Sequence, residues 1–183
     1  MTDSAELHKF FRLLDISRIK KSTKDKEDLK VTLKKSRTKG VGLYATKPIK
    51  KGQIVAYYKM KLFKYNTYDS PTKGMYAFTA YNKDGSENES LIGDLYLGSI
   101  PAPSRNIPYW ALFSNEPSKG QDENAYIDED ISKNFRSRNK LKAGETIIYK
   151  LVATRNIKPG EEITWCYGSG YYRNYRAPLC EKD

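Results

Sequence analysis

The sequence predicts a mainly β fold with short helices, in which short strands are joined by tight turns. The first observation is that apolar and polar residues alternate with a period of two in several short stretches, a pattern typical of half-buried strands. The second is an internal echo, since residues 45–52 read ATKPIKKG and residues 153–160 read ATRNIKPG. Two copies are too few for a stacked repeat protein, which needs at least about three. They indicate one strand–turn–strand design used twice in a compact domain.

The N-terminal stretch departs from this β pattern. Its apolar residues recur at helical spacing, at Leu7, Phe10, Phe11 and Leu14. Asp3 and Glu6 have the spacing of a capping box. We therefore expect an amphipathic helix at about 4–16, packed on the domain itself or on a partner. A polar and charged stretch follows at 17–28 and is expected to be a linker or a loose helix end.

Strand-like stretches begin at Leu29. Strands are expected at 29–34, 43–46, 54–63, 91–97, 146–153 and 162–167. Residues 66–74 are rich in turn residues, and the aromatic stretch 75–81 fits either a short helix or a strand. Residues 82–90 are expected to form a loop containing Asp-Gly, a pair that favours hairpin turns. Three prolines make 101–108 irregular.

The composition excludes several classes of protein. With 183 residues and 21.0 kDa, the chain has room for one domain and an extension. A single histidine, His8, and two cysteines, Cys166 and Cys180, cannot supply a zinc module with four closely spaced ligands. No apolar run reaches the roughly 18 residues of a membrane span, and the start lacks signal-peptide features. We expect a soluble, intracellular protein in a reducing compartment, without membrane contact, as a monomer or a homodimer.

The net charge of +11 is unevenly distributed. The first 39 residues carry 12 Lys and Arg against 6 Asp and Glu, which is more than half of the excess. A second basic cluster consists of Lys133, Arg136, Arg138, Lys140 and Lys142. This cluster is either a solvated loop or a surface that contacts the phosphates of DNA.

Three further segments hold patterns that can carry chemistry. Residues 39–45 (KGVGLYA) match a dinucleotide fingerprint in letters, but a Lys-Pro turn follows where that fingerprint needs a helix. Residues 113–124 (FSNEPSKGQDEN) have the composition of a loop. Residues 160–175 (GEEITWCYGSGYYRNY) combine a Gly-Glu turn, a short apolar strand and several tyrosines. Taken singly, these are a turn, a loop and a hairpin with aromatic packing.

In this order, the three segments resemble the SET-domain family of protein lysine methyltransferases. KGVGLYA is similar to the family's cofactor turn, SNEP and ENA to its Asn-His-Ser and Pro-Asn loop, and GEEITWCYG to its Gly-Glu-Glu and Tyr-Gly segment. The lack of a Cys-rich, zinc-binding post-SET segment resembles the compact viral type or the related PR domains. The implied fold is a set of small β-sheets around a pseudoknot. The SET domain would occupy 29–176, between an extension at 1–28 and a tail at 177–183.

The resemblance also implies roles for individual residues. Tyr167 matches the tyrosine treated as catalytic, and the channel for the substrate lysine is implied at Tyr171, Tyr172 and Tyr76. Cofactor-binding positions are implied at Lys39, Gly40, Val41, Gly42, Asn115, Glu116 and Tyr167. Asn124 and Glu162 are implied as structural residues of the pseudoknot, and no metal is implied. The sequence departs from the family at three positions, with Glu116 for His, Pro117 for Ser and Glu123 for Pro.

The resemblance implies an S-adenosylmethionine-dependent protein-lysine N-methyltransferase that releases S-adenosylhomocysteine. A histone in nucleosomes or another basic protein is the implied substrate, with a nuclear or chromatin location. The residue types suit the chemistry, because an apolar, tyrosine-walled channel disfavours the ammonium form of a lysine and needs neither a histidine base nor a metal. The alternative is a catalytically silent SET-like module that binds chromatin or nucleic acid, which Glu116 and the +11 charge favour.

Overall fold

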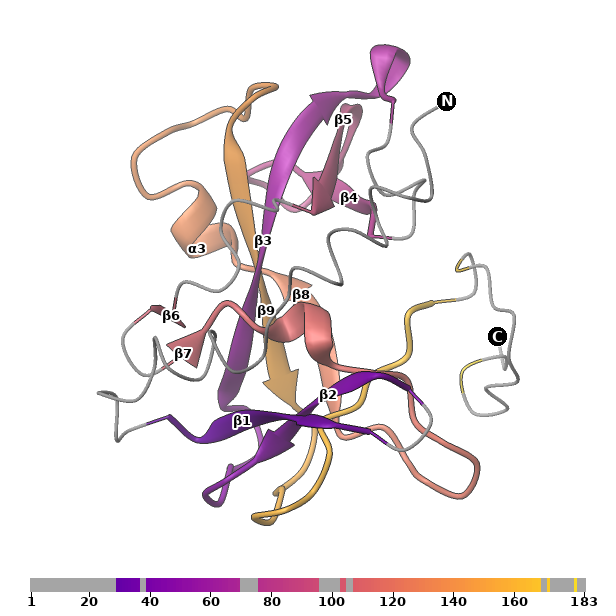
Figure 1. The fold of residues 1–183 in the computed structure, drawn as a ribbon. Coiled ribbons are helices and arrows are strands. Elements are labelled where there is room, and N and C mark those ends of the chain that lie inside the picture. The colour runs from indigo at the N-terminus through magenta and orange to yellow at the C-terminus, as the bar shows by residue number, and fades with distance from the viewer. Residues whose placement is uncertain are drawn as a thin grey trace. The chain divides into compact units, whose positions relative to one another are not determined.

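A computed structural model describes residues 29–36, 39–69, 76–95, 103–104, 107–168, 171 and 180. The helix expected at 4–16 lies outside these residues. The strands are β1 (Val31–Lys35), β2 (Val41–Ala45), β3 (Ile54–Lys64), β4 (Phe78–Tyr81), β5 (Glu87–Leu95), β6 (Pro103–Ser104), β7 (Ile107–Pro108), β8 (Ala125–Glu129) and β9 (Thr146–Ala153). The helices are η1 (Tyr65–Thr67), η3 (Ala111–Phe113) and α3 (Ile131–Asn134). The expected mainly β architecture with short helices is confirmed (Figure 1).

Most of the expected strands form. β8 was not expected, and the stretch 101–108, expected to be irregular, includes the paired strands β6 and β7. Two further expectations are corrected. Residues 87–90, expected in a loop, form the polar first half of β5. Glu87 is paired with Tyr81 of β4, and the Ser90 N–H donates to Asn88 Oδ1 at 3.2 Å. Residues 162–167, expected as a strand, make only isolated bridges, Tyr44 to Glu162 and Asn115 to Thr164. The Asp-Gly hairpin does form, with Gly85 at φ 85° and the Asn82 N–H donating to the Ser86 carbonyl at 2.7 Å.

The strands form three sheets. β1 pairs with β2, β6 pairs with β7, and the largest sheet has the order β4-β5-β3-β9-β8. The described residues divide into two compact units, the first made of 59–69, 76–95 and 129–149 and the second of the remainder. Among the helices of the described residues, none has the length and apolar character that crossing a bilayer requires.

Each unit has its own buried apolar side chains. In the first these include Met60, Leu62, Ala80, Leu95 and Ile147. In the second they include Leu33, Leu43, Ile49, Leu151, Ile157 and Ile163. Full burial of one such large side chain stabilises the folded state by about 1.5–3 kcal/mol. The alternation seen in the sequence therefore marks the inward faces of these strands.

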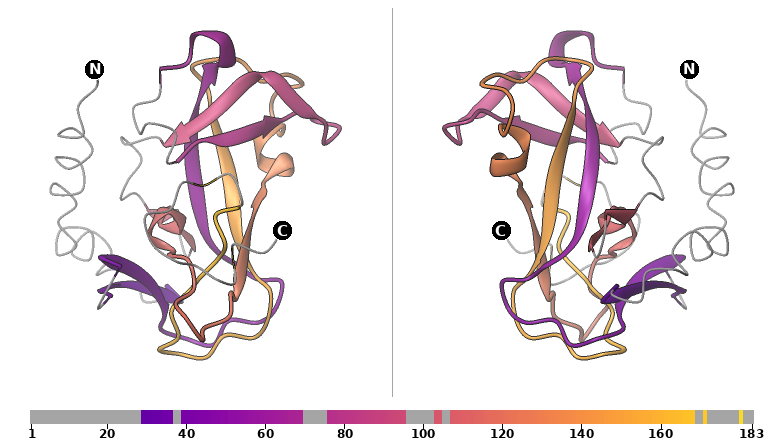
Figure 2. Two further views of the ribbon diagram at one scale, coloured as in Figure 1. Left: turned by 90° about the vertical axis from the view of Figure 1, so that its right-hand side faces the viewer. Right: turned by 90° about the vertical axis from the view of Figure 1, so that its left-hand side faces the viewer.

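The two echoed turns pair with each other in the second unit. Ile49 and Ile157 exchange both backbone hydrogen bonds, at 3.0 and 2.8 Å. The Gly52 N–H donates to the Ala153 carbonyl and the Gly160 N–H to the Ala45 carbonyl, each at 2.8 Å. Figure 2 shows the two turns side by side at the bottom of both views, one indigo and one orange. The sequence echo thus corresponds to a reciprocal, approximately two-fold contact.

Candidate functional site

The glycine turn, residues 39–42, runs into β2 and brings the backbone close to polar side chains. Gly40 has φ +75°, a conformation that side chains with a Cβ rarely adopt. A Cβ added to Gly42 would lie 2.8 Å from Glu162 Oε1 and 3.2 Å from Asn115 Nδ2. Only glycine allows Glu162 and Asn115 to approach the turn this closely.

Asn115 links the three motifs predicted from the sequence. Its Nδ2 donates to the Val41 carbonyl at 3.2 Å and to Glu162 Oε1 at 3.0 Å. Val41 belongs to the glycine turn and Glu162 to the C-terminal motif. Residues separated widely in the chain therefore meet at one amide group in the second unit.

Lys39 is a partly buried cation beside two carboxylates. Its Nζ donates to the backbone carbonyl of Glu116. Burial lowers the pKa of Lys39 below its usual value, against the opposing effects of the Glu162 and Glu116 charges. Burial also raises the pKa of the neighbouring Tyr44, and the Glu162 charge adds to this effect while a hydrogen bond with Ser36 opposes it.

Glu116, which the resemblance aligns with a histidine, has a buried side chain. It is only 2% exposed, and its Oε1 accepts the backbone N–H of Tyr167 at 2.8 Å. A hydrogen bond to a charged acceptor is stronger than a neutral one. The Glu116 side chain therefore anchors the backbone of Tyr167.

Tyr167 lies in the middle of an aromatic group. Its ring makes edge contacts with Trp165 at 5.0 Å and with Tyr171 at 4.8 Å between centroids. Its hydroxyl donates to the Ser114 carbonyl at 2.9 Å. The ring and the hydroxyl are thus both held, the ring by aromatic packing and the hydroxyl by backbone.

The segment 163–165 passes between two stretches of chain. On one side Ser114 Oγ donates to the Ile163 carbonyl at 2.8 Å and the Trp165 N–H to the Asn115 carbonyl at 3.1 Å. On the other, Asn124 Nδ2 donates to the Glu162 carbonyl at 2.8 Å, and Asn124 Oδ1 accepts the Thr164 N–H at 2.9 Å. These contacts are of the kind that a pseudoknot crossing needs, and they place Tyr167 just beyond it.

The remaining two predicted channel residues, Tyr76 and Tyr172, stay predictions. Tyr76 is half-buried and belongs to the first compact unit. Tyr172 lies outside the described residues. The described residues contain no group of three His, Cys, Asp or Glu side chains that could hold a metal ion.

Sequence reasoning missed Ser114, Trp165 and the pairing of the cysteines. Ser114 acts through its backbone carbonyl, which leaves no signal in the residue type. Cys166 and Cys180 form a disulfide with a Cα–Cα distance of 5.1 Å, and Cys180 is 6% exposed. This bond ties the residue before Tyr167 to the C-terminal region. A low cysteine count was expected to mean a reducing compartment, whereas the structure pairs both cysteines.

Removing this disulfide is expected to destabilise the protein. Closing a loop of about 15 residues contributes about 3 kcal/mol to the free energy of unfolding, and the sequence separation here is 14. Urea unfolding of the wild type with and without dithiothreitol should show this loss, whereas the variant Cys180→Ser should not respond to the reductant. Two titratable thiols in the unreduced wild type, or equal stability in both conditions, would contradict the prediction.

Comparisons with known proteins cover the region of the three motifs. Residues 40–168 match the family model of the SET domain. No curated protein sequence matches the chain. Similar solved structures include PFL0690c of Plasmodium falciparum, which carries a provisional assignment as a histone methyltransferase (16% identity, TM-score 0.49, 79% of this chain and 98% of that chain). Another is ctPRC2 in an autoinhibited conformation bound to S-adenosylmethionine (23% identity, TM-score 0.46, 78% of this chain). The alignment spans only 16% of that ctPRC2 chain.

Proposed function

This chain belongs to the SET-domain family, and on that premise we propose that it is an S-adenosylmethionine-dependent protein-lysine N-methyltransferase. The family match covers most of the chain, residues 40–168. The observation that carries the proposal is the position of Tyr167, whose hydroxyl is held on the Ser114 carbonyl beside the Asn115 junction. The catalytic candidate and the glycine turn therefore belong to one network of hydrogen bonds in the second unit.

The aromatic group suits a lysine that must react as a neutral amine. An ordinary lysine has a pKa near 10.4, and apolar surroundings lower it by disfavouring the ammonium form. The rings of Trp165, Tyr167 and Tyr171 supply such surroundings. Their faces also attract methylated ammonium groups through cation–π contacts. The same walls can therefore accept the substrate before and after transfer.

Tyr167 acts by orienting the groups that react. Its hydroxyl hydrogen is committed to the Ser114 carbonyl, so the oxygen presents its lone pairs to a third group. Those lone pairs can accept a weak C–H···O contact from a methyl group or an N–H bond from the lysine amine. Holding reactants in line can supply roughly 7–11 kcal/mol of the barrier in the best cases. Glu116 supports this role by fixing the backbone of Tyr167.

The glycine turn fits the amino-acid end of S-adenosylmethionine. A Cβ at Gly40 would meet no described atom within 4 Å, so the turn faces open space there. The ammonium of Lys39 and the carboxylate of Glu162 flank the turn and offer charges of both signs for a zwitterion. Lys39 to Gly42, with Asn115 and Glu116, would hold the cofactor. When bound, S-adenosylmethionine supplies the methyl group, activated by its sulfonium.

A basic protein such as a histone, in chromatin in the nucleus, is the substrate we propose. Glu123 supports this choice, because its exposed side chain accepts the Cys166 N–H at 3.2 Å, one residue before Tyr167. A carboxylate at that place complements lysine-rich peptides. We also propose the compact viral or PR-like subtype, supported by the use of both cysteines of these 183 residues in a disulfide.

The test is incubation of the full chain with S-adenosylmethionine labelled on its methyl group, together with histones, nucleosomes and a cell extract. We expect label on a protein lysine, and heat of binding when the cofactor is titrated in a calorimeter. Absence of label on every protein, together with absence of cofactor binding, would overturn the proposal. Mass spectrometry of a labelled peptide would identify the lysine and the number of methyl groups.

A further inference from the structure

The first compact unit has a pocket of its own at the end of β3. Its volume is about 580 Å³. Leu91 and Leu141, which are 8% and 9% exposed, contribute an apolar wall. All of its lining residues belong to the first unit, whereas the glycine turn and Tyr167 belong to the second. The pocket therefore shares no lining residue with the site proposed for methyl transfer.

Tyr65 gives this pocket an exposed aromatic side chain. It begins η1, lines the pocket and is 64% exposed. Among the described residues, Tyr65 and Tyr126 are the large hydrophobic side chains classed as exposed. Such a ring next to an apolar wall is suited to stacking on a flat partner. The pocket thus offers both a face for stacking and a volume that can admit a planar group.

The charged residues of the pocket are mainly cationic. Lys64 and Lys142 line it, both are exposed, and neither forms an ion pair with another described residue. Glu89 is the carboxylate among the lining residues. A planar group that carries negative charge beside it matches this arrangement. A nucleotide unit of a nucleic acid has that composition.

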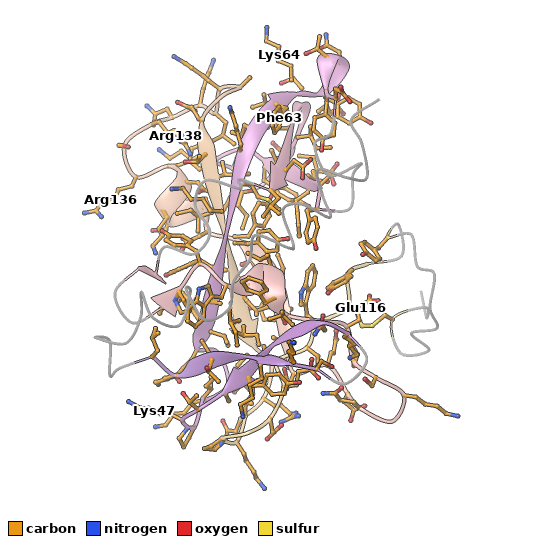
Figure 3. All side chains as sticks on the ribbon, viewed as in Figure 1. Lys47, Phe63, Lys64, Glu116, Arg136 and Arg138 are labelled. Atoms are coloured by element: carbon orange, nitrogen blue, oxygen red, sulfur yellow. A yellow bond between two sulfur atoms is a disulfide. The ribbon has the colours of Figure 1, made fainter. Side chains whose placement is uncertain are left out.

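A basic loop leads away from the pocket through Lys142. From Lys133 to Lys142 the chain has five Lys and Arg and no Asp or Glu. Arg136 and Lys140 are exposed, and Figure 3 shows Arg136 extending outward from the loop. These cations provide a track on which successive phosphates can bind.

Arg138, which lies in the same loop, makes side-chain hydrogen bonds to other residues of the protein. Its Nε donates to the Asn134 carbonyl at 2.6 Å, and its two terminal nitrogens bond Glu145 and the Thr146 carbonyl, each at 2.9 Å. Glu145 also accepts the Lys142 N–H at 2.8 Å. Arg138 therefore fixes the loop and is not part of the phosphate track. A loop held in this way loses little conformational freedom when a ligand binds.

We propose that the first unit binds single-stranded nucleic acid, with a base in the pocket against Tyr65 and phosphates along Lys64, Lys142, Lys140 and Arg136. A single strand exposes the faces of its bases, whereas a duplex keeps them stacked inside. The combination of an aromatic pocket and a cationic track therefore favours the single strand over the duplex. RNA and DNA share the chemistry that this site recognises.

Fluorescence anisotropy of the full chain tests the proposal without any cofactor, so its outcome is independent of methyl transfer. The probes are labelled single strands of RNA and of DNA of about 12 nucleotides, the corresponding DNA duplex, and polyglutamate. We expect at least one single strand to bind more tightly than the duplex and than polyglutamate. Equal or tighter binding of the duplex or of polyglutamate would overturn the proposal.

Paired variants test the named residues. Tyr65→Ala should weaken single-strand binding at least about fivefold, since base stacking is lost, whereas Tyr65→Phe should retain it. The double variant Lys64→Glu/Lys142→Glu should weaken binding and reduce the salt slope by about 0.7 for each cation removed. The matched control is Lys50→Glu/Lys51→Glu, which makes the same charge change on exposed residues of the second unit.

Thermal unfolding of each variant checks that its fold is intact. An unchanged affinity in Tyr65→Ala would exclude a base in the pocket. An equal loss of affinity in the Lys50/Lys51 control and in the Lys64/Lys142 variant would show that only total charge matters. Either result overturns the proposed site.

Discussion

Replacing Tyr167 with phenylalanine is expected to lower the rate of methyl transfer about 100-fold, a loss typical of misplaced reacting groups. The phenol is held by a 2.9 Å bond to the Ser114 carbonyl. Without the hydroxyl, the ring keeps its contacts with Trp165 and Tyr171 but loses the oxygen that orients the methyl group or the amine. The loss should therefore appear in the rate of transfer and in the number of methyl groups added, with little change in cofactor affinity.

Single-turnover transfer of labelled methyl groups measures this effect. Tyr126→Phe is the matched control, because it removes the same hydroxyl from a tyrosine that is 46% exposed. Loss of one hydrogen bond should cost Tyr167→Phe only about 1 kcal/mol of stability, which urea unfolding can verify. If Tyr167→Phe and Tyr126→Phe transfer methyl groups at the rate of the wild type, the assignment of Tyr167 is wrong.

Replacing Asn124 with alanine is expected to reduce the free energy of unfolding by about 3 kcal/mol. The side chain of Asn124 is fully buried, at 1% exposure, and bonds the chain on both sides of Ile163. Alanine would leave the Glu162 carbonyl without its amide donor and the Thr164 N–H without its acceptor. Each buried polar group left without a partner costs about 1–3 kcal/mol.

Urea unfolding followed by circular dichroism measures this loss. Asn156→Ala is the control, since Asn156 is exposed and accepts a hydrogen bond from the Lys51 N–H that water can replace. We expect the control to lose well under 1 kcal/mol, as is usual for surface positions. Comparable losses in the two variants would mean that the Asn124 amide does not hold the crossing segment.

The sequence predicted several strands that have one buried face, although it missed β8, whose burial also alternates. β9 has the bounds expected for it, Thr146–Ala153, because its buried residues alternate with half-buried ones. The first half of β5 was missed because its side chains are polar, which hides a strand whose first residue, Glu87, is paired with Tyr81 of β4. The segment 162–167 has strand-like composition, but its partners are single residues from distant loops. Periodicity reports the burial of one face and says nothing about which backbone lies alongside.

The candidate site was likewise predicted only in part. The order of three motifs was enough to choose Lys39, Asn115, Glu162 and Tyr167, and the structure brings these residues into one network. The interior position of Glu116 could not be predicted, because it depends on the fold of the distant Tyr167 segment. The hydrogen bonds by which Arg138 holds its loop could not be predicted either. A basic cluster in a sequence does not show which cations are bonded within the protein and which are exposed.

The reciprocal bonds between the two echoed turns constrain the order in which the chain folds. Lys51 and Asn156, which are bonded there, are 105 residues apart in the sequence. Closing so long a loop has an entropy cost that is incurred before the contact is gained, and folds rich in such distant pairings form slowly. At a synthesis rate of about 5–20 residues per second, the first turn is synthesised roughly 5 to 20 seconds before the second turn with which it pairs. The second unit is therefore completed only after its second turn has been synthesised, however early its first hairpin emerges.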